Sequence, residues 1–318
     1  MAAAVLDALA PVDGGTYVDA TFGRGGYTRA ILDAARTTVY AIDRDPDAIA
    51  AGEALAAQYP GRLHLIAGRF GELDTLLSER GAAPVDGIAF DLGVSTPQLE
   101  TPERGFAFQH DGPLDMRMGL DGPTAETIVN DLPEADLARI IRDYGEDRKA
   151  GRIAKGIARH RQAERITRTG VLADIVRRAA GGAKGEAIDP ATRTFQALRI
   201  YVNDELGELR RGLAAAERVL RAGGRLVVVA FHSLEDRLVK HVLRQRSGDL
   251  PNPSRHSPLP DTSEGPAPTF TLIQRSARKP GRAEAGANPR ARSARLRAAE
   301  RTAAPAWPAD AAGNGGAP

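Results

Sequence analysis

The chain has 318 residues, of which 42% are hydrophobic, and its 43 Lys and Arg nearly balance its 41 Asp and Glu. This length provides one large domain or two modest ones with a buried core, and the absence of cysteine excludes disulfide scaffolds, Cys-ligated metals and thiol nucleophiles. The first ten residues lack the basic segment of a secretory signal, and the apolar runs are far shorter than the roughly 20 residues that span a bilayer. We therefore expect a cytoplasmic protein with no membrane partner.

The first 90 residues alternate short apolar stretches with helix-like segments. Short β-prone runs separated by helices are typical of a parallel sheet wound with crossovers, which predicts an α/β fold. Strands are expected at 16–21, 38–42, 63–67 and 85–90, and helices at 27–35 and 46–58.

The alternation stops between residues 97 and 190, where only helices are expected, at 134–144, 147–162 and 170–180. A helical block inside one α/β pattern indicates an inserted domain, 97–190, within a discontinuous one, 1–96 and 191–301. The prolines of 247–268 predict a long loop, and the low-complexity segment 302–318 is expected to be disordered. The α/β pattern resumes with a helix at 191–220, a strand at 225–231 and a last strand at 269–274.

A glycine turn follows the first predicted strand in the sequence VDATFGRGGYT, and an acid, Asp43, ends the second strand 20 positions after Gly23. This order and spacing are typical of a site in which a carboxylate meets the ribose of a nucleotide or nucleoside. The third glycine of the NAD fingerprint is missing, which favours a cofactor without a pyrophosphate, such as S-adenosylmethionine. Asp19 could face the ammonium of its amino-acid moiety. An NAD-dependent oxidoreductase remains an alternative.

Two basic segments stand out against an otherwise acidic chain. Residues 148–178 carry a net charge of +8 and residues 275–301 a net charge of +7, which indicates a polyanionic partner. In the first segment, Lys149, Arg152, Lys155 and Arg159 form a stripe at helical spacing, a pattern more often merely solvated. We expect phosphate contacts from the second, in the motif NPRARSARLR at 288–297.

Several long motifs, in order from residue 18 to residue 301, resemble the bacterial 16S rRNA cytosine-N4-methyltransferases, also called the MraW family. They are DATFGRGG, AIDRDPDAI, DLGVSTPQLETPERGFAFQHDGPLDMRM, ATRTFQALRIYVNDEL, AFHSLEDRLVK and NPRARSARLRAAER. The resemblance implies a class I (Rossmann-like) methyltransferase sheet with an inserted all-helical domain. It also implies S-adenosylmethionine as the cofactor and a cytidine of the ribosomal decoding centre as the target.

Carried over from the family, the cofactor-binding residues would be Gly25, Gly26, Tyr27, Asp43, Phe70, Asp91 and Gln98. The glycines and the Tyr27 backbone would line the methionine end, and Asp43 would accept from the ribose hydroxyls. Phe70 offers an apolar face to adenine, and Gln98 can donate and accept near the reacting end. Many family members have His where Tyr27 stands, so a backbone role is expected there.

The implied reaction is an in-line methyl transfer to the exocyclic amino group, which an acceptor near that group would assist. Asp91 and Ser95, directly after the fourth predicted strand, are the candidates. His232, after the strand at 225–231, is either a base or target contact or the cap of the following helix. Methylation at C5 is disfavoured because that route uses a Cys nucleophile. The other histidines lack metal-ligand spacing, so we expect no metal.

The implied partner is 16S rRNA, with the assembled small subunit as the expected substrate because two separated basic segments imply a broad surface. Phe106 and Phe108 could stack on RNA or pack between the two domains. Asp111, Asp115 and Arg117 resemble family residues near the target. A non-catalytic RNA-binding assembly factor that keeps the fold is the second alternative, and the oligomeric state stays open.

Overall fold

The computed structural model describes residues 1–181, 189–249, 266–281, 284, 286 and 288–308. The chain divides into two compact units. Of the described residues, Met1–Gly93 and those from 206 to 308 form the sheet unit, and those of Val94–Glu205 form the helical unit.

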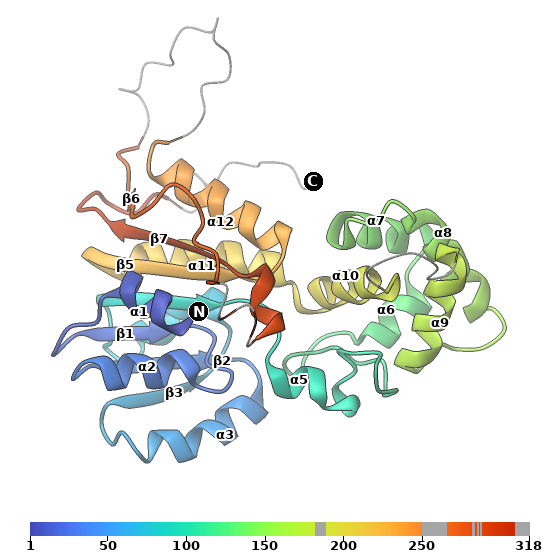
Figure 1. Ribbon diagram of the computed structural model, residues 1–318, viewed down its shortest axis with the longest axis horizontal. Coiled ribbons are helices and arrows are strands. Elements are labelled where there is room, and N and C mark those ends of the chain that lie inside the picture. Colours follow the sequence, from blue (N-terminus) through green and yellow to red (C-terminus); the bar gives the residue numbers. More distant parts are fainter. Residues whose placement is uncertain (182–188, 250–265, 282–283, 285, 287, 309–318) are drawn as a thin grey trace, which may run out of the picture. The chain divides into compact units, whose positions relative to one another are not determined.

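The sheet unit contains a seven-stranded mixed sheet in the order β3-β2-β1-β4-β5-β7-β6. Strands β1 to β5 are parallel, whereas β7 runs antiparallel between β5 and β6 (Figure 1). The predicted α/β fold is confirmed. The strands are β1 Thr16–Asp19, β2 Thr38–Asp43, β3 Leu63–Ala67, β4 Val85–Asp91, β5 Leu220–Ala230, β6 Phe270–Leu272 and β7 Arg295–Arg301.

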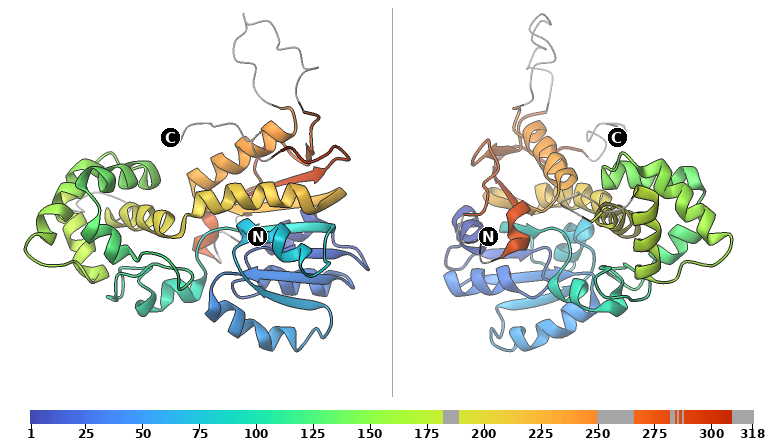
Figure 2. Two further views of the ribbon diagram at one scale, coloured as in Figure 1. Left: turned by 180° about the vertical axis from the view of Figure 1, so that it is seen from behind. Right: turned by 45° about the vertical axis from the view of Figure 1, so that its right-hand side comes forward.

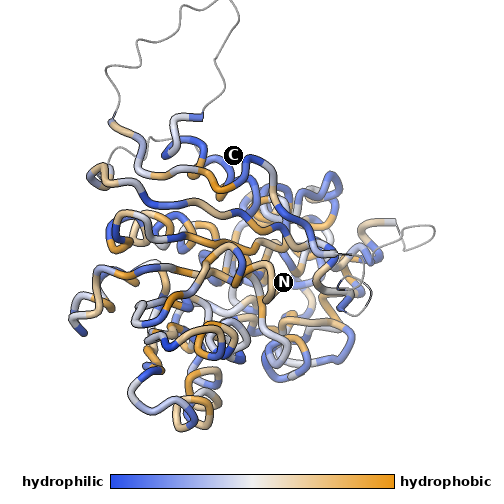
Figure 3. The backbone as a smooth tube through the Cα atoms, turned by 60° about the vertical axis from the view of Figure 1, so that its left-hand side comes forward, coloured by the Kyte–Doolittle hydropathy of each residue, from blue (hydrophilic) through white to orange (hydrophobic). Residues whose placement is uncertain are grey.

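Helices cover both faces of this sheet, because side chains of successive strand residues point to opposite faces and both sets are apolar. Val18 and Ile88 pack with α4 (Leu73–Ser78), α11 (Glu205–Val219) and α12 (Ser233–Arg246). Tyr17 and Ala89 pack with α1 (Ala2–Leu9), α2 (Gly26–Ala34) and α3 (Pro46–Ala56). Figure 1 views the sheet from the side of α1 and α2, and the reverse view in Figure 2 brings α11 forward. Figure 3 shows hydrophobic segments running along the strands between these helices.

The helices of the sheet unit begin and end at recognisable signals. For α3, the Asp45 side chain accepts a hydrogen bond from the Asp47 amide, and Pro46 occupies the first turn, where its missing N–H costs nothing. None of the described helices has the length and apolar character needed to cross a membrane. The helices are α1 Ala2–Leu9, α2 Gly26–Ala34, α3 Pro46–Ala56, α4 Leu73–Ser78, α11 Glu205–Val219 and α12 Ser233–Arg246, with 3-10 turns η1 Phe70–Glu72 and η3 Pro289–Ser293.

The helical unit has its own apolar core. Ile140, Ile153, Leu172 and Leu198 are buried in it, one from each of its four longest helices. Its elements are α5 Thr96–Glu100, η2 Pro102–Arg104, α6 Ala125–Asp131, α7 Glu134–Gly145, α8 Ala150–Arg161, α9 Thr169–Ala180 and α10 Ala191–Asn203. Three of these helices lie where the sequence predicted them, within a few residues at each end.

The boundaries of the inserted domain differ from the expected 97–190. Residues 191–205 belong to the helical unit and not to the sheet domain, because Phe195 and Leu198 of α10 are buried in the helical core. The single helix expected at 191–220 is also wrong. Asp204 adopts a left-handed conformation with a φ of 49°, which ends α10, and a second helix, α11, follows.

The C-terminal part contains two further corrections. Part of the basic motif at 288–297 and the residues after it form β7, inside the sheet, where no strand was expected. Residues 302–308 are not disordered, because Trp307 donates hydrogen bonds to Glu217 and to the Ala267 carbonyl. The other predictions for this part, a loop over 250–265 and disorder over 309–318, lie outside the described residues.

Candidate functional site

Acidic side chains gather where the parallel strands of the sheet unit end. Asp19, Asp43 and Asp91 are the last residues of β1, β2 and β4. Carboxyl ends of parallel strands form the edge at which ligands of open α/β sheets bind. The three acids predicted from the sequence therefore share one edge of one unit.

The loop after β1 depends on its glycines. Gly23 and Gly25 have φ values of 51° and 71°, a region that L side chains rarely adopt. A Cβ on Gly25 would lie 2.7 Å from Leu55 and 2.8 Å from the Phe22 ring, whereas a Cβ on Gly26 would meet nothing within 4 Å. Gly26 is the first residue of α2, so its exposed amide end offers donors to a ligand.

Asp43 ties this loop to β2. Its carboxylate accepts hydrogen bonds from the Gly23 amide at 2.7 Å and the Asp45 amide at 2.9 Å. Burial raises its pKa above the usual value for a carboxyl. Each carboxylate oxygen has a second lone pair, so Asp43 can still accept from hydroxyl groups. This hydrogen bond between Gly23 and Asp43 explains the spacing of 20 positions in the sequence.

Asp19 holds the two ends of the loop between β1 and α2 by accepting hydrogen bonds. Its oxygens accept from the Thr21 amide at 3.2 Å, the Thr28 amide at 3.1 Å and the Thr28 hydroxyl at 2.7 Å. The side chain is buried, and burial raises its pKa to about 6. Asp19 is only 1% exposed, whereas Asp43 is partly exposed, so we assign Asp19 to holding the turn and not to an ammonium ligand.

Asp91 differs from Asp19 in that its pKa is raised further above the usual value for a carboxyl. The Tyr27 hydroxyl donates to its Oδ1 at 3.2 Å, and its own amide donates to the Thr21 hydroxyl at 2.6 Å. Burial, with a smaller contribution from the charge of Asp19, raises the pKa of Asp91 to about 7, while the Tyr27 hydrogen bond lowers it. A carboxyl with this pKa can accept a proton at neutral pH.

Phe70 opens the 3-10 turn that follows β3. Its ring is 5.5 Å from the Phe90 ring, edge to face, and a Cβ on Gly212 would come within 2.7 Å of it. Phe70 is nevertheless only partly buried. One part of the ring therefore packs in the core, and the remainder can face a ligand.

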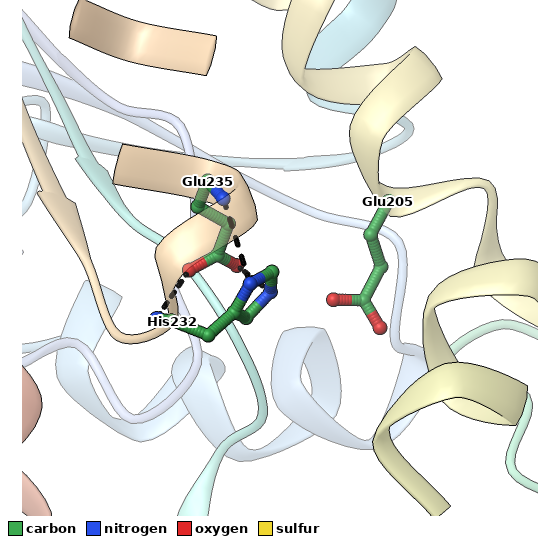
Figure 4. Close-up of side chains that lie close together, drawn as sticks. All are labelled: Glu205, His232 and Glu235. Carbon is green, nitrogen blue, oxygen red and sulfur yellow. Dashed lines mark hydrogen bonds and ion pairs between the residues drawn. The ribbon is translucent and has the colours of Figure 1, made fainter. Parts of the chain in front are cut away.

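His232 caps α12 (Figure 4). The amides of Phe231 and His232 donate to Glu235 Oε2, and His232 Nε2 lies 3.1 Å from Glu235 Oε1. The Glu235 amide donates to His232 Nδ1 at 3.5 Å. The cap role considered for His232 from the sequence is therefore present, and Glu235 is its partner.

The remaining predicted residues belong to the helical unit. Ser95 and Gln98 form a reciprocal capping box at the start of α5, in which the Ser95 amide donates to Gln98 Oε1 at 2.9 Å. Phe108 packs against Phe195 with ring centroids 4.9 Å apart, and Phe106 is buried in the same helical core. Their packing is thus within this unit.

The three polar residues singled out near the target form ion pairs. Arg168 binds Asp111, and the Arg117 guanidinium binds Asp115 through two nitrogens at 2.8 Å each. The hydrogen bond from the Gly170 amide, together with Arg168, lowers the pKa of Asp111. Burial opposes the lowering at Asp115, but the hydrogen bonds and the charge of Arg117 outweigh it, and the pKa of Asp115 is lowered as well. Sequence reasoning missed two supports of the site, Thr21 and Thr28, although a threonine on each side of a glycine turn was a visible signal.

The sheet order with an antiparallel seventh strand, the glycine loop and the acids at the strand ends define a class I methyltransferase. The family model of the MraW methylase family matches residues 1–302, and the chain belongs to this family. S-adenosylmethionine is accordingly its cofactor. The open space at Gly26 and the Asp43 carboxylate, which binds Gly23 of the same loop, fit that group. Membership of this family excludes the alternative of an NAD-dependent oxidoreductase.

Curated relatives cover nearly the whole chain. It is 58% identical to the ribosomal RNA small subunit methyltransferase H of Paramagnetospirillum magneticum, over 96% of this chain and 95% of the relative. It is 61% identical to the protein of that name from Rhodospirillum centenum, over 95% and 91%. Among solved structures, an rRNA methylase from Streptococcus thermophilus matches with a TM-score of 0.40 and 12% identity, over 95% of this chain and 93% of that one.

Proposed function

We propose that this protein transfers the methyl group of S-adenosylmethionine to the N4 amino group of a cytidine in the decoding centre of 16S rRNA. The relatives named above act on small-subunit rRNA, which supports the substrate class. The observation that carries the reaction is Asp91, a carboxyl at the ligand-binding edge whose pKa is raised to about 7. The proposed substrate places the activity in the cytoplasm.

The residues of the sheet unit would hold the cofactor in the following way. Gly25, Gly26 and the Tyr27 backbone line the methionine end, where a Cβ at Gly26 would intrude on open space. Asp43 accepts from the ribose hydroxyls through lone pairs not used by the Gly23 and Asp45 amides. Phe70 presents its partly exposed ring to adenine.

When bound, S-adenosylmethionine would supply an electrophilic methyl group to N4, and its sulfur would keep the electron pair of the broken S–C bond. N4 would then carry two protons and a positive charge, and one of these protons must leave to give the neutral methylated base. The ionised Asp91 carboxylate accepts this proton. Tyr27 holds Asp91 Oδ1 by its 3.2 Å hydrogen bond and keeps the pKa of Asp91 from rising further.

Ser95, Gln98 and His232 receive supporting roles in this proposal. Ser95 and Gln98 fix the start of α5, directly after the chain leaves β4, and thereby the course of the backbone beyond Asp91. His232 fixes the chain after β5 through Glu235. The helical unit recognises the RNA, and the assembled small subunit is the expected substrate.

The direct test is transfer of labelled methyl from S-adenosylmethionine to small subunits that lack the modification, followed by mass spectrometry of the nucleosides. We expect N4-methylcytidine with the native chain and none with Asp43→Ala. Asp13→Ala, which changes an exposed acid of the same unit, is the matched control. Cofactor binding without any label would favour the assembly-factor alternative, and label in a different nucleoside would contradict the proposed target.

The pH profile tests the role of Asp91. A base must be ionised, so kcat/KM, which reports the pKa of the free enzyme, should fall as the pH drops through about 7 and level off above it. Asp91→Asn should lower kcat by about 100-fold or more. Tyr27→Phe removes the hydrogen bond that lowers the pKa of Asp91, and the acid limb should therefore move to higher pH. An unchanged limb in Tyr27→Phe would exclude Asp91 as the titrating base.

A further inference from the structure

The surface of α8 concentrates basic side chains without acids. Residues 148–163 contain six Lys and Arg and no Asp or Glu. Ile153, Ala154 and Ile157 are fully buried in the helical core, which fixes the orientation of the helix. Arg152, Lys155 and Arg159 lie on the opposite, exposed side, and Arg148 is exposed just before the helix; these four residues are the α8 stripe.

Five other arginines of the helical unit form ion pairs. Arg165 binds Glu126 and Asp131, Arg168 binds Asp111, and Arg177 binds Asp174 and Asp189. On α7, Arg139 binds Asp136 and Arg142 binds Asp143. Within the described ranges, by contrast, no hydrogen bond or ion pair engages a side chain of the α8 stripe. As far as the described residues go, its four charges are available to a partner.

The last turn of α9 extends this surface. Gly156 of α8 lies against α9, since a Cβ there would be 3.0 Å from Ala179. A Cβ on Gly181, just past α9, would be 3.6 Å from an Arg152 guanidinium nitrogen. Arg178, exposed in this last turn, is a fifth cation without a partner among the described residues.

The geometry points to a ligand with repeated negative charges. From Arg148 to Arg159 the α8 stripe extends about 16 Å at the rise of an α-helix, longer than one phosphate group. The exposed side of α8 carries no large apolar side chain that would enter a bilayer. We propose that the α8 stripe binds the phosphate backbone of rRNA, and this rests on the proposed function. Lys149, included in the sequence-predicted stripe, has another interaction in the structure.

The test compares two triple variants of the full chain with the same change in charge. The stripe variant is Arg152→Gln with Lys155→Gln and Arg159→Gln. The control is Arg139→Gln with Arg142→Gln and Arg165→Gln, three exposed arginines that are paired in the same unit. The readouts are binding to small subunits over a range of salt concentrations, and KM and kcat for methyl transfer.

Each phosphate contact adds about 0.7 to 0.9 to the slope of log K against log salt. The stripe variant should therefore lose about 2 units of slope and bind at least about tenfold more weakly at moderate salt. Its KM should rise by a similar factor while kcat at saturating subunits stays unchanged. The control should keep the native slope. Arg152→Lys with Arg159→Lys, which retains the charges, should also keep it.

Equal slopes for the stripe variant and the native chain would overturn the inference, even if methylation proceeds. Binding of the native chain and of the stripe variant to anionic phospholipid vesicles is measured as well. If the stripe variant loses binding to the vesicles but binds small subunits as the native chain does, the inference is overturned and the stripe binds a membrane surface instead. Failure of the native chain to methylate subunits would instead count against the proposed function. Salt-dependent binding distinguishes the two failures because it needs no turnover.

Discussion

The two basic segments carry almost the same net charge in the sequence, yet the structure uses them in opposite ways. In residues 148–178, the α8 stripe leaves its charges exposed. In residues 275–301, Arg297 binds Asp236 through two hydrogen bonds, and Arg301 is buried and donates to backbone carbonyls. The net charge of a segment therefore does not predict how many of its cations remain unpaired, because the acids that pair with them can come from elsewhere in the chain.

The phosphate contacts expected for 288–297 stay a prediction, although Arg295 and Arg297 of this motif have partners inside the protein. Arg278 binds Asp7 and Arg275 binds Asp249, and the Arg295 guanidinium donates to the carbonyls of Ser293 and Ala294. Arginines in this part hold β7 and its neighbours together. The predictions below separate such structural cations from the free ones of α8.

The largest effect is expected at Arg301. Its guanidinium donates to the carbonyls of Glu217, Thr269, Thr302 and Ala304, and Arg301→Ala leaves the buried acceptors without donors. The free energy of unfolding should fall by about 3 kcal/mol, measured by denaturant unfolding. Arg159→Ala on the α8 stripe is the matched control. Equal losses in the two variants would contradict the distinction.

A smaller loss is expected at Arg297. The pair with Asp236, at 2.8 Å and 3.1 Å, is partly buried, so Arg297→Ala should cost about 2 kcal/mol. A double-mutant cycle with Asp236→Ala measures the coupling between the two side chains. Additive losses would mean that the pair contributes nothing to the attachment of β7.

Trp307 should contribute less. The Arg246 guanidinium lies 4.1 Å from the centroid of its ring, and its indole N–H donates to the Ala267 carbonyl. Trp307→Ala should lower the free energy of unfolding by about 1 to 2 kcal/mol. Limited proteolysis should then cleave near residue 302 sooner than in the native chain, with Trp307→Phe intermediate. Identical cleavage in all three would show that the ring does not hold this segment.

The smallest effect on stability is expected for the α8 stripe. Its side chains are exposed and bind no acid in the described part of the helical unit. The triple Gln variant should therefore change the free energy of unfolding by at most about 0.5 kcal/mol for each residue replaced. Thermal unfolding checks this. A cooperative loss of several kcal/mol would show that the stripe has a structural role and would undermine its use as an RNA contact.

The sequence was informative where residues close in the chain act together. The apolar runs at 63–67 and 85–90 became β3 and β4, and the glycine turn with Asp43 became a hydrogen-bonded unit. The bond between Tyr27 and Asp91 joins residues 64 positions apart and depends on the packing of β1 beside β4. Neither the spacing of residues nor the composition of the chain predicts that contact.

β7 was missed because its pattern is hidden by charge. Its sequence RLRAAER has buried positions at Leu296, Ala298 and Ala299, but three arginines and a glutamate alternate with them. A segment of this composition is typical of a solvated tail. It becomes a strand because Asp236 and the carbonyls around Arg301 accept the charges, and those partners are distant in sequence.

The place of β7 in the sheet has a consequence for the order in which the protein is made. In the described part of the sheet, β6 pairs with β7 alone, and β7 also covers the outer edge of β5. During synthesis from the N-terminus, β5 emerges about 70 residues before its antiparallel neighbour and presents a row of unpaired backbone groups meanwhile. A chain stopped before Arg295 would therefore carry an open edge, and release from the ribosome at that stage would favour aggregation over folding.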